Sequence, residues 1–108
     1  MSVFFIAEIK ITDAAWVQDY AAEVHKIVAW HGGKYLSRSG NISSIEGAKK
    51  DANLIALIQF PGEAELRGFV NDPAYQPYIG SRRAGSISQI TMIDDTDLAG
   101  TISYLKKA

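Results

Sequence analysis

Cysteine is absent from this sequence, and its 108 residues include only three prolines. The absence of cysteine excludes disulfide bonds, thiolate metal ligands and a cysteine nucleophile. No apolar run approaches the roughly 20 residues that a membrane-spanning helix needs. The apolar N-terminal stretch is interrupted at Glu8 and Lys10 and has no basic leader, so it does not resemble a signal peptide. We therefore expect a cytoplasmic protein with no membrane partner.

An excess of charge of one sign is also lacking. Eleven basic and twelve acidic side chains nearly cancel and form no block, so the electrostatic footprint of a nucleic-acid-binding protein is missing. The sequence contains no phosphate-binding glycine loop, no Gly-x-Ser-x-Gly nucleophile elbow and no metalloprotease helix motif. It therefore suggests no cofactor and no metal site, and it leaves open whether the protein is an enzyme.

What is present is one domain over residues 1–96, followed by a tail over residues 97–108. Hydrophobic periodicity predicts strands over 3–11, 34–39, 53–60 and 87–93, and helices over about 13–31 and 62–71. Residues 42–46 fit a continuation of the second strand after a kink, and 47–51 a polar loop. The tail fits either a short helix or an additional strand.

A second helical start follows at Asp72, which precedes a proline in the first helical position. Pro77 and Gly80 are expected to keep this helical piece short or irregular.

The element order is β-α-β-β-α-β. Two interlocked right-handed β-α-β units of this kind give an α+β, ferredoxin-like fold, with a four-stranded antiparallel sheet and both helices on one face.

Two strands are apolar on both faces, which a sheet with one solvated face does not need. In the first strand, Val3 and Phe5 begin an apolar row on one face, and Phe4 and Ile6 are apolar residues on the other face. The third strand shows the same pattern. Because the helices cover one face only, a second copy of the chain is the simplest cover for the other. We expect a homodimer that pairs sheet to sheet.

Several short blocks, in order, carry a family resemblance. They are Ile11-Thr12-Asp13, Tyr20, His31-Gly32-Gly33, Arg38, Ile45-Glu46-Gly47, Phe60-Pro61, Asp72-Pro73-Ala74-Tyr75-Gln76 and Arg82. With these blocks the chain, from about Phe5 to Asp94, resembles the domain of unknown function 1330 family, within the dimeric α/β-barrel (ferredoxin-like) superfamily. The resemblance implies the fold and a dimer. It implies no activity, because the family has none agreed and the superfamily includes monooxygenases, haem-handling enzymes, isomerases and ligand-sensing domains.

The chain departs from the family pattern in three places. Gln59 stands where the family often has a glutamate, Pro77 follows the Tyr-Gln pair, and the tail is additional. The glutamine removes a candidate acid or base from position 59.

Three residues are candidates for chemistry. His31, at the end of the first helix, suits a base at neutral pH, or it is a helix-end residue favoured by the dipole. Arg38, which we expect on a strand face with Leu36, suits binding of a carboxylate or enolate oxygen. Glu46 suits a base or a partner for Arg38, and a structural Arg38–Glu46 bridge explains the pair equally simply.

Tyr75, Tyr78 and Arg82 follow the second helical start. Two phenols and a guanidinium there suit the mouth of a pocket for an anionic or aromatic molecule. Alternatively, Tyr75 packs beneath the loop with its hydroxyl bonded to backbone.

Three functions fit these residues. The sequence favours a homodimer that binds a small, anionic or aromatic molecule between sheet and helices, with Arg38, Glu46, Tyr75, Tyr78 and Arg82 as ligand-binding residues. A cofactor-independent isomerase or monooxygenase would use Arg38 with Glu46 or His31. A structural dimer without a ligand is the third.

Overall fold

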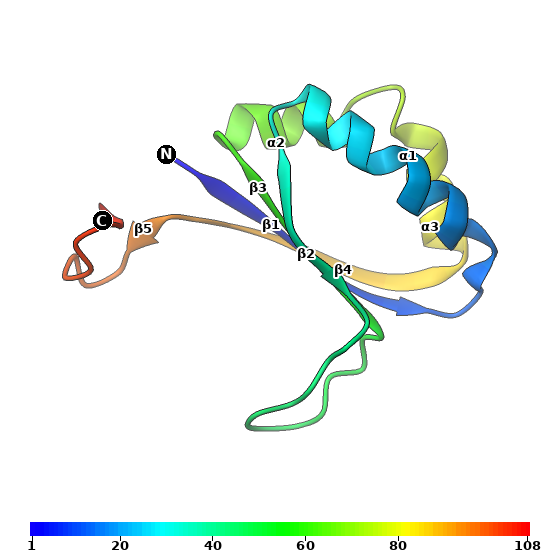
Figure 1. Cartoon of the computed structure of the whole chain (residues 1–108), viewed down its shortest axis with the longest axis horizontal. Helices are drawn as coiled ribbons and strands as arrows, with labels where there is room; N and C mark the ends of the chain where they lie inside the picture. Colours follow the sequence, from blue (N-terminus) through cyan, green and yellow to red (C-terminus); the bar gives the residue numbers. More distant parts are fainter.

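A computed structural model describes all residues 1–108, and it contains one main sheet covered on one face by helices (Figure 1). The strands of this sheet are β1 (Val3–Ile11), β2 (Lys34–Ser39), β3 (Leu54–Phe60) and β4 (Ser86–Asp94). Their spatial order is β2-β3-β1-β4, with every neighbouring pair antiparallel. The helices are α1 (Val17–Trp30), α2 (Glu63–Val70) and α3 (Gln76–Ala84). The predicted ferredoxin-like, α+β fold is confirmed.

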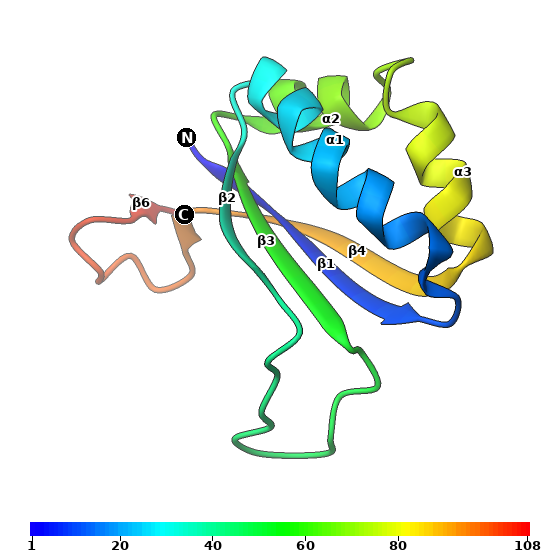
Figure 2. The ribbon, with the colours of Figure 1, turned by 45° about the vertical axis from the view of Figure 1, so that its right-hand side comes forward.

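The helix-covered face of the sheet forms the core. Burial alternates along β1, with Val3, Phe5, Ala7 and Ile9 buried and the intervening residues only partly so. Phe5 meets Phe69 of α2 edge to face, with ring centroids 6.0 Å apart. The opposite face carries no helix, as Figure 2 shows.

The first helix begins with a short 3-10 turn, η1 (Ala14–Trp16). The Asp13 side chain accepts a hydrogen bond from the Ala15 N–H at 3.0 Å and so caps this turn. At the other end Gly32 has φ of 75°, the left-handed conformation that ends a helix and that glycine adopts readily.

The second helical start is later than predicted. Asp72 caps a turn by accepting from the Ala74 N–H at 2.9 Å, and α3 begins only at Gln76. Pro77 therefore falls in the first turn of α3, where its missing N–H costs no helical bond, so the helix is short, at nine residues, but regular.

Two segments project from the sheet, the loop over 40–53 and the tail (Figures 1 and 2). The prediction of strand over 42–46 is wrong, because these residues have no regular structure beyond a bend that starts at residue 45, and they pair with no strand. The tail is neither a helix nor a fifth strand of the main sheet. Its β5 (Thr96–Asp97) and β6 (Lys106–Lys107) pair in parallel with each other, and the Asp97 carboxylate accepts three backbone N–H bonds, from Ala99, Thr101 and Ile102.

Candidate functional site

An apolar cavity of about 40 Å³ lies between α1 and the sheet. It is lined by Phe5, Ala7, Trp16, Val17, Tyr20, Ala21, Tyr35, Arg38, Leu54, Ala56 and Ile58. Arg38 is the one charged residue among them, and the phenols of Tyr20 and Tyr35 add polar groups. An apolar chamber with a few placed polar groups is the usual form of a small-molecule site.

A β-bulge places Arg38 at this cavity. The pairing of β2 with β3 shifts between Tyr35 and Ser37, so Tyr35 opposes Ile58 and Arg38 opposes Ala56. Both partners belong to the helix-covered face of β3. The expectation that Arg38 shares a face with Leu36 is therefore wrong, because the extra residue reverses the alternation and aligns Arg38 with Tyr35.

The Arg38 side chain closes the cavity on one side. Its Nη1 donates to the Ala21 carbonyl in α1 at 3.1 Å, and its guanidinium carbon lies 5.3 Å from the centre of the Tyr35 ring, within the range of a cation–π contact. Beyond it lies a surface groove of about 440 Å³ that Tyr35 and Arg38 also line, with His25, Leu36 and Ser37. Arg38 is exposed to solvent and lines both the apolar cavity and the more open groove.

Two cavity-lining phenols are held neutral. Burial raises the pKa of Tyr20 far above its usual range, and a hydrogen bond with the Tyr75 hydroxyl acts in the same direction. Burial also raises the pKa of Tyr35, an effect that the nearby Arg38 charge partly opposes. At neutral pH both side chains carry a proton, so they are hydrogen-bond donors rather than bases.

Tyr75, Tyr78 and Arg82 do not line one pocket. Tyr75 is fully buried, stacked on Phe69 and bonded to the Tyr20 hydroxyl instead of to backbone. Tyr78 lines a separate surface groove beside η1. Arg82 lines a third, near the start of β4.

His31 lies away from the cavity. It follows the last turn of α1, about 16 Å along the helix from Tyr20 at 1.5 Å per residue. Its Nε2 is 2.7 Å from the Asp72 carboxylate, and that bond, with one from the Ala74 N–H, lowers the pKa of Asp72. The pair ties the end of α1 to the turn before α3, which supports the structural interpretation of His31.

Glu46 lies exposed in the 40–53 loop and forms no ion pair with Arg38. The unpredicted loop conformation explains this, because the chain leaves the sheet after Ser39 and does not continue the strand. A base supplied by Glu46 to the cavity is not seen.

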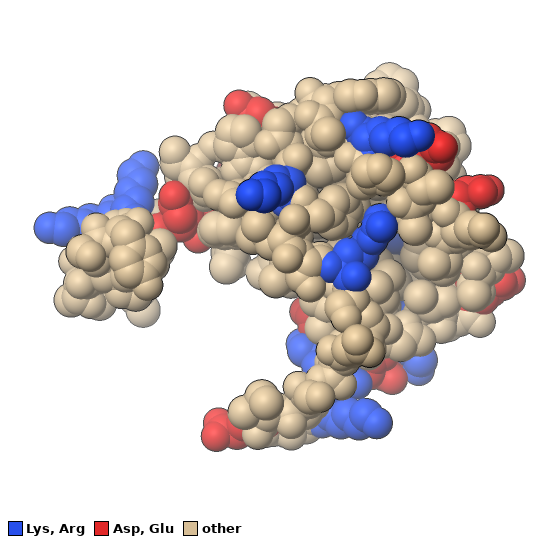
Figure 3. All heavy atoms as spheres, in the orientation of Figure 1, with Lys and Arg blue, Asp and Glu red and all other residues tan.

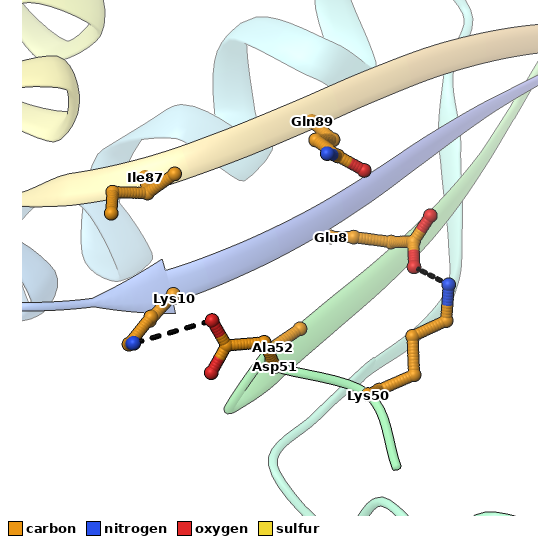
Figure 4. Close-up of a pocket in the computed structure, with 7 residues that line it drawn as sticks. All are labelled: Glu8, Lys10, Lys50, Asp51, Ala52, Ile87 and Gln89. Carbon is orange, nitrogen blue, oxygen red and sulfur yellow. Dashed lines mark hydrogen bonds and ion pairs between the residues drawn. The ribbon is translucent and has the colours of Figure 1, made fainter. Parts of the chain in front are cut away.

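A further pocket, on the helix-free face, is drawn in Figure 4. Its charged side chains already pair with one another, Glu8 with Lys50 and Lys10 with Asp51. They fasten the loop to β1, and they leave no unpaired charge to attract a ligand. Elsewhere, no three His, Asp, Glu or Cys side chains are grouped closely enough to hold a metal ion, and no helix is long and apolar enough to cross a membrane.

Of the residues at the cavity, the sequence identified Arg38 as a candidate, but it did not identify Tyr35 as the neighbour of the Arg38 guanidinium or Tyr20 as a second phenol in the lining. The helical spacing of Tyr20 with apolar residues indicated burial, while nothing in the sequence around Leu36 signals a bulge.

Solved structures with the same fold have low sequence identity to this chain. A protein of unknown function from Rhodopseudomonas palustris matches with a TM-score of 0.74 at 13% identity, covering 86% of this chain and 81% of its own. A dimeric ferredoxin-like protein of unknown function from Jannaschia sp. CCS1 matches with a TM-score of 0.65 at 12% identity, and the match covers 87% of this chain and 99% of that protein. SnoaB, a cofactor-independent oxygenase from Streptomyces nogalater, matches with a TM-score of 0.61 at 16% identity, and the match covers 85% of this chain and 90% of SnoaB. At these identities the likeness shows the fold alone.

No curated protein matches the sequence. A family model does: that of the domain of unknown function DUF1330 matches residues 2–96, from before β1 to the start of β5. This range contains every element that forms the cavity and leaves out the tail over residues 97–108. The chain therefore belongs to the DUF1330 family, as the resemblance in the sequence indicated.

Proposed function

We propose that this protein is a homodimer that binds a small apolar or aromatic molecule carrying an oxyanion, in the cavity between α1 and the sheet. The observation that carries the proposal is the position of Arg38, the single charge in an otherwise apolar lining. Arg38 is exposed to solvent at the wall of this cavity, and its planar guanidinium can pair with a carboxylate or enolate oxygen through charge-assisted hydrogen bonds.

The remaining lining defines the rest of the ligand. Phe5, Ala56 and Ile58 offer only carbon surface, so the body of the molecule is apolar. The protonated phenol of Tyr35 can donate one further hydrogen bond, next to the group that Arg38 holds. The Tyr20 hydroxyl is already engaged by Tyr75.

Ligand entry requires Arg38 to move. The closed cavity of about 40 Å³ has room for a few water molecules, whereas ligand pockets measure roughly 300–1,000 Å³. If Arg38 leaves the Ala21 carbonyl, the cavity joins the outer groove of about 440 Å³. The proposed site is therefore the cavity and groove together, with Arg38 as the movable wall.

The helix-free face of the sheet supports the dimer. Its apolar side chains include Ile93 and Ile87, which are 52% and 64% exposed, and the partly buried Phe4 and Ile6 between them. This face borders the hollow between tail and loop that the space-filling view shows (Figure 3). A second copy would remove this surface from water, and two similar structures are described as dimeric ferredoxin-like proteins.

A catalytic role has less support. The alternative, an isomerase or monooxygenase acting without a cofactor, relied on Glu46 or His31 as the base, and neither lies at the cavity. The description of SnoaB as a cofactor-independent oxygenase keeps oxygenation as the reaction class to assay. In such a reaction the substrate itself or a water molecule would have to act as the base.

A thermal-shift screen with small carboxylic acids and phenols tests the binding proposal. Wild type, Arg38→Ala and Arg67→Ala are compared, since Arg67 is an exposed arginine on α2 paired with Glu63. We expect an aromatic acid to raise the melting temperature of wild type and Arg67→Ala but not of Arg38→Ala. Equal stabilisation of all three proteins refutes Arg38 as the anchor. If no compound stabilises any of them, the binding proposal fails and the remaining hypothesis is a structural dimer without a ligand.

Light scattering tests the dimer separately. We expect twice the chain mass at micromolar concentration, and a monomer there would contradict the proposal. Replacing Ile93 by lysine is expected to shift the protein towards monomer, because a charge on that face opposes its burial.

A further inference from the structure

Arg82 is a buried cation without a partner. It lies on the inward face of α3, and the whole residue is 4% exposed. Its Nε is enclosed and forms no hydrogen bond, and its guanidinium takes part in no ion pair. Nε is the only nitrogen of Arg82 that is both enclosed and unbonded, so the terminal nitrogens retain some contact with solvent.

Such an arrangement is costly for a folded protein. A buried charge is normally paired or coordinated, and each unsatisfied buried polar group in a native structure calls for an explanation. The nearby Tyr20 phenol does not supply an anion, because burial keeps it protonated and it bonds to the Tyr75 hydroxyl and not to Arg82. The chain therefore positions a largely buried guanidinium, with only its terminal nitrogens in contact with solvent, and supplies no anion for it.

The pocket that Arg82 lines has the character of an anion site. Its volume is about 260 Å³, and its other lining residues are Arg83, Ser86, Ser88 and Ile90. A second guanidinium stands at its edge, and no acidic side chain lines it.

The two serines are organised by a chain of hydrogen bonds. The Ser86 hydroxyl donates to the Arg82 carbonyl, which satisfies that group at the end of α3. The Ser88 hydroxyl lies 2.9 Å from that of Ser86, and since the Ser86 proton is engaged, Ser88 is the donor. A hydroxyl rotates freely, so Ser88 can turn its proton towards an anion beside Arg82.

One effect opposes an anion here. Arg82 and Arg83 occupy the last turn of α3, where the helix dipole is negative. That partial charge is about half an elementary charge, and the Gly85 N–H and the Ser86 hydroxyl already bond to carbonyls there. Two full positive charges outweigh it.

We propose that the pocket formed by Arg82, Arg83 and Ser88 binds a small oxyanion, the phosphate or carboxylate group of a small molecule. The site shares no lining residue with the cavity that Arg38 closes. The two binding proposals are therefore tested independently of each other.

Nuclear magnetic resonance of the full chain tests the site through the Arg82 Nε–H group itself. Sodium phosphate and sodium acetate are titrated separately at constant ionic strength, with chloride as the reference. We expect a saturable shift of the Arg82 Nε–H resonance, and the anion with the tighter binding identifies the class as phosphate or carboxylate. A resonance unmoved by both anions, or one that drifts without saturation, would overturn the proposal.

Variants give a second readout. Arg82→Met should lower the affinity by about ten- to a hundred-fold, as expected for loss of hydrogen bonds from a charged donor. Its melting temperature should no longer rise with the anion, whereas that of Arg67→Met should rise as in wild type. A rise retained in Arg82→Met contradicts the assignment. The resonance in wild type can be assigned through its bonded carbons, so the test does not depend on the variant folding.

Discussion

Arg38 of β2 donates a hydrogen bond to the carbonyl of Ala21 in α1, with 3.1 Å between Nη1 and the oxygen. The contact joins the sheet to the helix directly over the apolar cavity. It also holds the guanidinium 5.3 Å from the Tyr35 ring. The same side chain thus closes the cavity, contacts one of its phenols and provides its only charge.

The Arg38 charge should be measurable at Tyr35. Burial raises the pKa of Tyr35 and Arg38 lowers it, so Arg38→Met should raise it further, because a tyrosinate loses its neighbouring cation. Ultraviolet titration of tyrosinate in wild type, Arg38→Met and Arg67→Met measures this. An unchanged titration in Arg38→Met would mean that the guanidinium does not face the phenol in solution.

The Tyr20–Tyr75 hydroxyl pair should show strong coupling. Tyr20→Phe leaves the Tyr75 hydroxyl buried without its partner, which should cost about 1–3 kcal/mol of unfolding free energy. The double variant with Phe at both positions should cost less than the two single changes added together, since no orphaned hydroxyl remains. Denaturant unfolding of all four proteins measures the cycle, and additive losses would contradict a direct bond.

Gly85 and Gly80 should respond in opposite directions to alanine. A Cβ at Gly85 would lie 2.4 Å from Cδ1 of Trp16, whereas one at Gly80 would meet nothing within 4 Å. Gly85→Ala should destabilise by about 1–3 kcal/mol through overpacking. Gly80→Ala, inside α3, should stabilise by about 0.5–1 kcal/mol. Thermal and denaturant unfolding measure both, and a neutral Gly85→Ala would show that Trp16 packs elsewhere.

The tail should loosen in acid. Hydrogen bonds from backbone N–H groups, first that of Ile102, lower the pKa of Asp97 in the folded chain. The ionised Asp97 carboxylate therefore contributes its full stabilisation of the folded tail above the unfolded pKa of about 3.9. This contribution is lost as the pH falls through the lower pKa of the folded chain.

Amide hydrogen exchange across residues 99–102 reports this change. Protection should fall with acid in wild type. In Asp97→Asn it should be weak at every pH, with little pH dependence of its own after correction for intrinsic exchange. Equal protection in both proteins would contradict the role given to the carboxylate.

Element types were predictable because their signals are local. The run of β-branched and aromatic residues in β1 and the two glycines that follow α1 are such local signals, and the β-α-β-β-α-β order then restricts the topology. The start of α3 was predicted too early because an Asp-Pro pair can cap either a helix or a turn. In this chain Asp72 caps a turn, and α3 begins four residues later.

The site was less predictable because it depends on pairings between distant segments. The bulge at Leu36 comes from how β2 aligns with β3, and that alignment decides which way Arg38 points. The 40–53 loop, which carries Glu46 away from Arg38, likewise contacts β1 through residues distant in the sequence, as in the Lys10–Asp51 ion pair. Short-range sequence patterns contain neither fact.

The most direct test of the proposed function is a crystal structure of the protein with the most strongly stabilising compound from the thermal screen. The account predicts ligand density between α1 and the sheet, with an oxyanion on Arg38 and the bond from Arg38 to Ala21 broken. Density at another site, beside a cavity still closed by Arg38, would contradict it.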